Sequence, residues 1–281
     1  MEIVAAILTL GGLGLIFGGL LALAAQRFAV EEDPRVAQIE EALPGANCGA
    51  CGYAGCANFA EAVAKGEAEP TGCIPGGKDT SQAICKILGK DAEGSESCRQ
   101  VAEVGCIGDK ETAKDRFQYD GVKDCRAAQM YNGGFKGCPY GCLGLGTCAA
   151  VCPFEAITMN EKGLPEIDEE RCTGCGICVN ECPRGVLRLK DADRKGHVVL
   201  CNSKDKAKIV RSVCDVGCIA CKACERVCEK GAIKIIDNLA VIDPALCDDC
   251  GKCAEKCPRP VIVNLQLDAM REKEGEPAAA K

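Results

Sequence analysis

The chain has 281 residues, and 26 of them are cysteine, against one histidine, no tryptophan and 4% aromatic residues. So few aromatic side chains make a poor apolar core, which means that the cysteines must contribute through disulfides, zinc or iron–sulfur clusters, and a single histidine argues against mixed Cys/His zinc sites. Lys and Arg number 34 against 41 Asp and Glu, and the net charge of −7 argues against a nucleic-acid binder.

The first predicted element is a single transmembrane helix within residues 1–26. Ile3 to Ala25 are all apolar or small, and no ionisable residue interrupts them. A helix of this length crosses the roughly 30 Å hydrocarbon layer of a bilayer. A cleaved secretory signal is the alternative, because Ala22-Leu23-Ala24 resembles a cleavage site. The length of the run and the absence of a positive n-region favour an anchor.

Residues 27–90 are predicted to form a small membrane-proximal [4Fe–4S] domain. They contain the spacing C-x2-C-x4-C-x16-C, and the glycines around the first three cysteines let backbone amides approach the sulfurs. Zinc is the alternative for four thiolates without histidine, but the cluster motifs farther along the chain favour iron and sulfide. The predicted ligands are Cys48, Cys51, Cys56 and Cys73.

Residues 91–190 are predicted to contain a first ferredoxin-like module with a preceding segment. The run C-x2-C-x2-C-x3-C-P begins at Cys172, and a looser run with the same ending begins at Cys138. In such pairs the fourth cysteine of each run ligates the other cluster, and zinc knuckles have a different spacing. The predicted groups are Cys138, Cys142, Cys148 and Cys182, and then Cys152, Cys172, Cys175 and Cys178.

Residues 191–265 repeat this pattern as a second ferredoxin-like module. Its predicted ligand groups are Cys218, Cys221, Cys224 and Cys257, and then Cys228, Cys247, Cys250 and Cys253. Short β-like runs between the paired motifs predict a small antiparallel hairpin in each module, at 156–158 with 165–168 and at 232–236 with 240–243. The polar residues 266–281 predict a disordered tail. The fold class expected for the whole chain is therefore α+β.

Six cysteines remain outside these groups. Four of them stand in matching places ahead of the two modules, and this symmetry predicts a sixth [4Fe–4S] cluster in addition to the five; buried free thiols are the alternative. The four are Cys106, Cys125, Cys201 and Cys214, whereas Cys85 and Cys98 are expected to be free thiols.

Nothing in the sequence predicts a site that transforms a substrate. Gly144 and Gly146 match a dinucleotide fingerprint in letters only, because they lie between cluster ligands without a strand–helix context. His197 is expected to be a solvated surface residue. With no nucleotide loop and no catalytic triad, the chain is expected to carry electrons and to bind neither flavin nor NAD.

Basic residues gather between the two modules. They predict a docking surface for an acidic ferredoxin, and a solvated linker is the alternative. The residues are Lys190, Arg194, Lys195, Lys204, Lys206, Lys208 and Arg211.

The order of these features resembles the B subunit of the Rnf ion-translocating electron transport complexes, in a long form with two ferredoxin-like units. The resemblance rests on the N-terminal span, the Cys48 to Cys73 group, the run from Gly141 to Cys148 and the ferredoxin pair that follows. It implies an electron-transfer component of a membrane-bound ferredoxin:NAD⁺ oxidoreductase coupled to Na⁺ or H⁺ translocation. It further implies that this component accepts electrons from soluble reduced ferredoxin, whereas flavin, NAD and ion sites belong to other membrane and peripheral subunits.

The resemblance and the motifs agree on location, because clusters need reduced thiols. We expect a single-pass protein of the plasma membrane with a cytoplasmic cluster-bearing body. The alternative function is a stand-alone polyferredoxin that relays electrons to a soluble oxidoreductase, and the apolar span argues against it. A secreted disulfide or zinc scaffold is disfavoured by the motif spacing.

Overall fold

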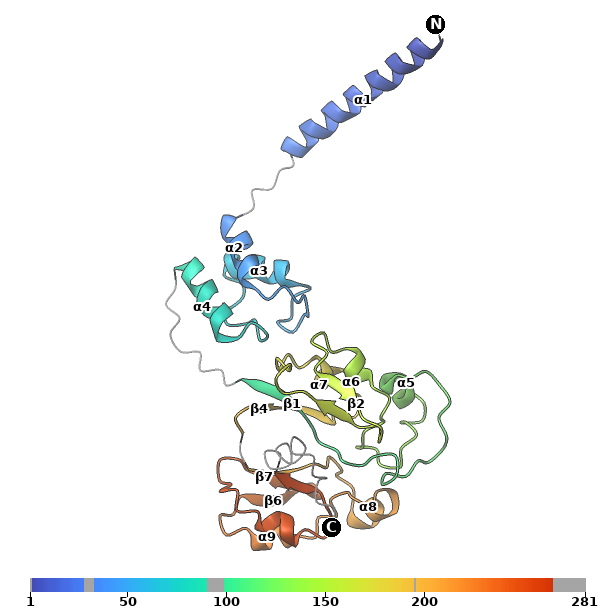
Figure 1. Ribbon diagram of the computed structural model, residues 1–281, viewed down its shortest axis with the longest axis vertical. Helices are drawn as coiled ribbons and strands as arrows, with labels where there is room; N and C mark the ends of the chain where they lie inside the picture. The colour runs from blue at the N-terminus through green and yellow to red at the C-terminus, as the bar shows by residue number, and fades with distance from the viewer. Residues whose placement is uncertain (1, 28–32, 90–98, 195, 265–281) are drawn as a thin grey trace.

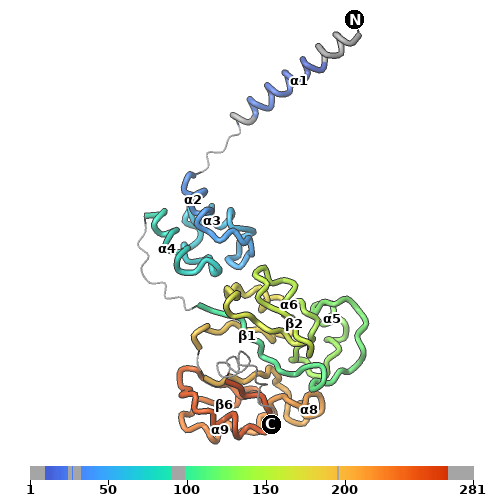
Figure 2. Tube along the Cα trace, viewed as in Figure 1, coloured from blue at the N-terminus to red at the C-terminus, as the bar shows by residue number. Residues whose placement is uncertain are grey.

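The computed structural model describes residues 2–27, 33–89, 99–194 and 196–264, and shows an elongated chain of helical and α+β units (Figure 1). The trace runs from an N-terminal helix through a helical unit to two β-containing lobes (Figure 2). Cys98, Lys195 and the predicted tail 266–281 lie outside the described residues. The mixture of short helices and two-stranded sheets agrees with the predicted α+β class.

Helix α1 (Glu2–Arg27) occupies the segment for which the sequence predicts an anchor. Its side chains are described only at 10–24 and at 27, and there Leu10, Leu15 and Leu21 are exposed. Within the described part of the chain, no helix has both the length and the hydropathy needed to cross a membrane.

A three-helix unit follows α1. Helices α2 (Pro34–Ala42), α3 (Cys56–Lys65) and α4 (Gly77–Leu88) pack around three fully buried side chains, Ile39, Phe59 and Ile84. Each helix contributes one of these side chains, so the unit has a small apolar core of its own. Cys85 is also buried, on α4, and forms no disulfide.

The first lobe contains two antiparallel strand pairs and three short helices. Strand β1 (Gln100–Val104) pairs with β4 (Leu187–Asp191), and β2 (Ile157–Met159) pairs with β3 (Pro165–Ile167). The second pair is the hairpin predicted from the sequence. The helices are α5 (Cys125–Met130), α6 (Thr147–Ala150) and α7 (Ile177–Glu181).

The second lobe repeats this plan. Strand β5 (His197–Val199) pairs with β8 (Ile262–Asn264), and the predicted hairpin is present as β6 (Ile233–Ile236) with β7 (Leu239–Ile242). Its helices are α8 (Ala207–Val213), α9 (Ala223–Val227) and α10 (Lys252–Lys256). In both lobes the first and last strands pair with each other, which brings the ends of each lobe together.

Backbone hydrogen bonds join the two lobes. Lys114 donates its N–H to the carbonyl of Val213 at 2.9 Å, and Asp215 donates to the carbonyl of Thr112 at 2.9 Å. These bonds flank the bridge between Ala113 and Cys214. The segment before the first module is therefore paired directly with the segment before the second.

Candidate iron–sulfur sites

We assign the predicted cysteine ligands to six groups, and the structure brings the members of the first five together. We number them in their order along the molecule, from the helical unit to the second lobe. Group I is Cys48, Cys51, Cys56 and Cys73; group II is Cys152, Cys172, Cys175 and Cys178; group III is Cys125, Cys142, Cys148 and Cys182; group IV is Cys106, Cys138, Cys201 and Cys214; group V is Cys218, Cys221, Cys224 and Cys257; group VI is Cys228, Cys247, Cys250 and Cys253.

Group I surrounds a largely apolar cavity of about 320 Å³ in the helical unit, as predicted. Asn47 has a positive φ of 47°, and its side-chain oxygen accepts the N–H of Cys56 at 2.8 Å, which fixes the start of α3. A Cβ at Gly55 would lie 2.8 Å from that oxygen, so glycine is needed there. Burial raises the pKa of the Cys73 thiol, and the sulfurs of the other three members raise it further.

Group II lines a cavity of about 320 Å³ beside β1 and the β2–β3 hairpin, also with the predicted members. The N–H of Ala102 on β1 lies 3.4 Å from the sulfur of Cys172, and the N–H of Ala156 lies 3.4 Å from that of Cys152. Burial, and after it the sulfurs of the other members, raise the pKa of Cys178 to about 11. The backbone of the lobe therefore points amide donors at this group.

Group III differs from the prediction. The crossed pairing placed Cys138 with Cys142, Cys148 and Cys182, but the structure places Cys125 in their cavity of about 410 Å³. Burial, and after it the sulfurs of Cys125 and Cys182, raise the pKa of Cys148 to about 12. The physical reason is the path of the chain, because Arg116 donates its N–H to the carbonyl of Phe135 at 2.7 Å and closes the intervening segment into a loop.

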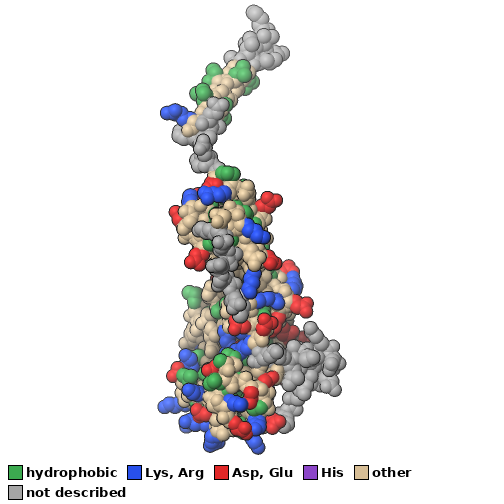
Figure 3. All heavy atoms as spheres, turned by 90° about the vertical axis from the view of Figure 1, so that its left-hand side faces the viewer, with side chains coloured by type: hydrophobic (Ala, Val, Ile, Leu, Met, Phe, Trp, Pro, Cys, Tyr) green, Lys and Arg blue, Asp and Glu red, His purple; other side chains and the backbone are tan. Residues whose placement is uncertain are grey.

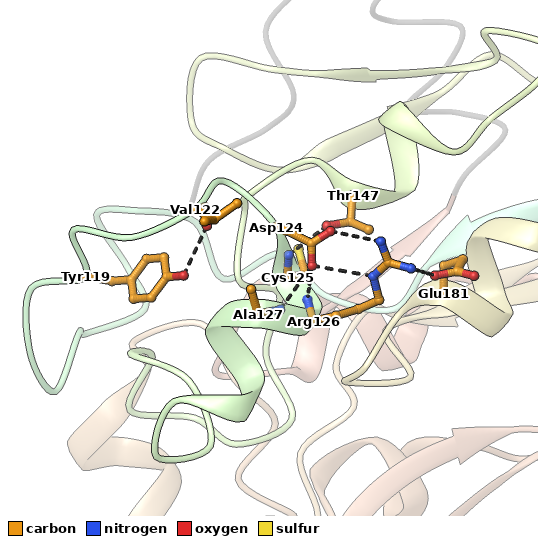
Figure 4. Close-up of polar contacts among 8 residues, drawn as sticks. All are labelled: Tyr119, Val122, Asp124, Cys125, Arg126, Ala127, Thr147 and Glu181. Carbon is orange, nitrogen blue, oxygen red and sulfur yellow. Dashed lines mark hydrogen bonds and ion pairs between the residues drawn. The ribbon is translucent and has the colours of Figure 1, made fainter.

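A polar network holds Cys125 in group III (Figure 4). Asp124 caps α5 by accepting the N–H groups of Arg126 and Ala127, and the Arg126 side chain holds the pKa of Asp124 down at about 2. The same guanidinium reaches Glu181 on α7 at 2.5 Å. The N–H of Cys125 donates to the hydroxyl of Thr147 at 2.6 Å.

This network connects residues that stand directly before three of the four group III cysteines. Asp124 precedes Cys125, Thr147 precedes Cys148, and Glu181 precedes Cys182. The polar residue directly before each of these three cysteines is a sequence signal for their shared group. The spacing of the cysteines alone does not reveal it.

Group IV contains three of the four cysteines predicted for a sixth site, with Cys138 in place of Cys125. Burial raises the pKa of Cys138, and the Cys214 sulfur raises it further. Burial raises the pKa of Cys106 to about 11, and the Cys138 sulfur contributes. Burial raises the pKa of Cys201 to about 11, with a contribution from Cys106. A Cβ on Gly108 would lie 3.4 Å from the Cys214 sulfur and 3.7 Å from that of Cys106, so both sulfurs lie beside this glycine.

Group V occupies the second lobe with its predicted members, and in group VI the structure brings Cys247 close to Cys253. Group V lines a cavity of about 330 Å³, and burial together with the neighbouring sulfurs raises the pKa of Cys224 to about 11. In group VI, burial raises the pKa of Cys253 to about 11, and the Cys247 sulfur contributes. Cys221 and Cys250 are exposed.

The donor chemistry of the groups fits an iron–sulfur cluster. Thiolates that repel one another in an apolar cavity need a cationic partner, and cluster iron supplies it to four cysteine sulfurs. Among the described residues, no three His, Cys, Asp or Glu side chains stand close enough to share a single metal ion.

His197 differs from its prediction as a solvated surface residue. It is buried on β5, and its Nδ1 lies 2.6 Å from the carboxylate of Asp249, which also accepts two hydrogen bonds from the Asn264 amide. The partners lie 52 and 67 positions away in the chain, so local sequence does not reveal them.

The basic segment is partly used inside the fold. Lys190 is buried and pairs with Glu169 at 2.7 Å, which takes it out of a docking surface. Lys204, Lys206, Lys208 and Arg211 remain exposed. Figure 3 shows Lys and Arg side chains at the lower end of the molecule, where the second lobe lies, with Asp and Glu side chains among them.

Comparisons with known proteins agree with these groups. A family model for an Fe-S cluster matches residues 43–75, and two models of a 4Fe-4S dicluster domain match residues 139–189 and 171–233. The chain therefore contains 4Fe–4S ferredoxin-like domains; the first match lies in the first lobe, and the second extends from the first lobe into the second.

Three curated relatives cover most of the chain. The B subunit of the Na(+)-translocating ferredoxin:NAD(+) oxidoreductase complex of Acetobacterium woodii is 46% identical, over 89% of this chain and 74% of the relative. The B subunit of the ion-translocating oxidoreductase complex of Methanosarcina acetivorans is 42% identical, over 91% of this chain and 96% of the relative. The B subunit of the proton-translocating ferredoxin:NAD(+) oxidoreductase complex of Clostridium ljungdahlii is 42% identical, over 95% of each.

Proposed function

This chain belongs to the family of B subunits of the Rnf-type ion-translocating oxidoreductase complexes, and we propose that it relays electrons from a reduced ferredoxin through six [4Fe–4S] clusters to the other subunits of a ferredoxin:NAD⁺ oxidoreductase. Each of groups I to VI supplies the four thiolates of one cluster. Flavin, NAD and the transported Na⁺ or H⁺ bind to the partner subunits.

The observation that carries this proposal is the serial arrangement of the six groups. At each step, a cysteine of one group lies close enough to a cysteine of the next to raise its pKa, in addition to the larger effect of burial, and short separations between centres are what an electron relay requires. These cysteines are Cys48 and Cys175 between groups I and II, Cys178 and Cys148 between II and III, Cys142 and Cys106 between III and IV, Cys218 and Cys201 between IV and V, and Cys224 and Cys253 between V and VI.

Group IV is the link between the two lobes in this series. The N–H of Cys218 in group V lies 3.4 Å from the sulfur of Cys201 in group IV. On the other side, the sulfur of Cys142 in group III contributes to the raised pKa of Cys106, of which burial is the main cause. A cluster at group IV therefore supports a continuous route, whereas free thiols there would leave a gap between the lobes.

The direction of transfer follows from the ends of the series. Group I lies in the unit next to α1, so it is the exit toward the membrane partners. Groups V and VI have the exposed cysteines, Cys221 and Cys250, which suits exchange with a soluble donor. We accordingly divide the chain into an anchor at 1–26, the group I domain at 27–90, the modules at 91–190 and 191–265, and a tail at 266–281.

The anchor would be single-pass with the clusters on the cytoplasmic side. Exposed leucines on α1 and the absence of ionisable residues between Ile3 and Ala25 support it. A stand-alone polyferredoxin is the alternative. Recovery of the chain from soluble extract without partner subunits would favour that alternative, whereas co-purification with membrane subunits supports the relay.

The direct test is the iron and acid-labile sulfide content of the full chain, purified without oxygen. Six clusters predict about 24 iron and about 24 sulfide per chain, and five predict about 20 of each. Two or fewer iron atoms per chain would contradict the assignment of all six groups.

A further inference from the structure

Arg184 is a buried cation beside two of the proposed clusters. It is 7% exposed, follows Cys182 and Pro183, and lines the group III cavity. Its Nη1 donates to the carbonyl of Cys138, a group IV member, at 2.5 Å. Its own carbonyl accepts the Asn202 amide, next to Cys201, at 3.3 Å. The residue therefore stands at the junction of groups III and IV.

The hydrogen-bond partners of this guanidinium are uncharged. Nε donates to the side-chain oxygen of Gln129 at 2.6 Å, and Nη2 donates to the carbonyl of Gly133 at 2.6 Å. In the described ranges, no carboxylate forms an ion pair with Arg184. A buried charge without a counter-charge is strongly destabilising, so negative charge is expected nearby.

The sulfurs of groups III and IV supply that negative charge. Burial lowers the pKa of Arg184, and the nearby Arg116 lowers it further. The sulfurs of Cys138, Cys142 and Cys182 act in the opposite direction. The cation and the thiolates of both groups thus stabilise each other in a low-dielectric site.

Resting on the proposed function, we propose that Arg184 is the shared counter-charge of the clusters at groups III and IV and raises the reduction potential of both. One-electron reduction changes the charge of a cluster with its four thiolates from about −2 to about −3, so a fixed positive charge beside it favours the reduced form. The electron that arrives from the donor is then held at the buried middle of the series, away from the exposed ends.

The test compares Arg184→Gln, which removes the charge but keeps an amide donor, with Arg184→Lys, which keeps the charge. The full chain is titrated anaerobically, and cluster reduction is followed by electron paramagnetic resonance. In Arg184→Gln, two one-electron components should show at least a tenfold lower ratio of reduced to oxidised cluster at a fixed potential. A tenfold change corresponds to a reduction potential that is lower by about 59 mV. In Arg184→Lys both should stay within about threefold of the unsubstituted chain, since the charge remains.

Arg171→Gln is the matched control. Arg171 directly precedes Cys172, but its side chain is half-exposed and pairs with Glu155 at 3.0 Å, so its charge is compensated and screened. The titration of this variant should match that of the unsubstituted chain. Because a guanidinium does not titrate in this range, the Arg184→Gln shift should be the same at pH 6 and pH 9.

The remaining outcomes each support or overturn the inference. Full iron content with unchanged potentials in Arg184→Gln would overturn it and leave the proposed relay intact. Equal shifts in potential in Arg184→Gln and Arg184→Lys would overturn it as well. Loss of iron from both variants would show a purely structural role and also overturn it. Loss from Arg184→Gln, with normal iron and potentials in Arg184→Lys, would support it, because charge is what the lysine retains. Low iron in the unsubstituted chain would instead refute the proposed clusters.

Discussion

Arg126 shows how one side chain can set the membership of a cysteine group. It spans Asp124 and Glu181, and so ties the start of α5 to the end of α7. Cys125 and Cys182 are the next residues after these two acids, and the tie brings them into one cavity. An exposed ion pair stabilises a fold by only about 0–1 kcal/mol, so the role of this pair is mainly geometric.

Paired cysteine substitutions distinguish the two arrangements of groups III and IV. The double variant Cys125→Ala with Cys182→Ala removes two ligands of group III and should lose about four irons. Cys125→Ala with Cys138→Ala should lose about eight under either arrangement, because the two cysteines belong to different groups in both, and it serves as the control. Iron and sulfide analysis of the purified chains checks both values.

The crossed pairing expected from spacing makes the opposite prediction. It places Cys138 with Cys182, so Cys138→Ala with Cys182→Ala would lose about four irons, whereas the structure predicts about eight. A loss of four in this third variant would restore the pairing derived from the sequence.

At the scale of elements, the helical unit carries group I between α1 and the lobes. Its Cys48 lies close enough to Cys175 of group II to raise the pKa of that thiol, for which burial is the main cause. Cys51→Ala should leave the clusters of the lobes reducible by ferredoxin and should block NAD⁺ reduction by the assembled complex, since the last station of the relay is lost. Stopped-flow spectra of cluster reduction and the steady-state rate of NADH formation measure the two effects.

Cys85→Ala is the control for this prediction. Cys85 is a buried cysteine on α4 in the same unit, outside the six groups, so its replacement should retain all the iron and the NADH formation rate. Normal NADH formation in Cys51→Ala would remove group I from the electron route.

Elements and groups defined by short spacing could be predicted from the sequence. The two hairpins follow from short β-like runs, and groups I, II and V each contain three cysteines within a few positions of one another, whereas the fourth member comes from the motif pattern. The position of Cys125 could not be predicted, because it depends on Arg116 meeting Phe135 and on Arg126 meeting Glu181, 55 positions away. The same holds for His197, whose burial depends on β8 closing over β5.

At the scale of the whole molecule, helix α1, the helical unit and the two lobes follow one another along the long axis (Figure 1). The exposed basic side chains Lys204, Lys206 and Lys208 lie in the second lobe, the end at which the proposed relay accepts electrons. Lys204 follows Cys201 by three positions, and its carbonyl accepts the Asn238 amide at 3.1 Å, which holds this segment against the turn between β6 and β7. An acidic protein docked there would contact the second lobe, which also holds the exposed cysteines Cys221 and Cys250 of the proposed donor end.

Changing Lys204, Lys206 and Lys208 together to glutamate should therefore slow electron entry from ferredoxin. Each residue is exposed, and ferredoxins are acidic, so the substitution replaces attraction by repulsion during encounter. The rate constant from stopped-flow mixing should fall about tenfold or more at low salt, and much less above about 0.5 M salt, where the Debye length is only a few ångströms. Reduction by a small uncharged donor should not change.

The control is the same change at Lys65, Lys78 and Lys86 in the helical unit. It alters the net charge equally, far from the proposed docking surface, and should have little effect on the rate of electron entry. Equal slowing by both triple variants would show that net charge governs the encounter, and an unchanged rate at low salt in the first would place the ferredoxin site elsewhere on the molecule.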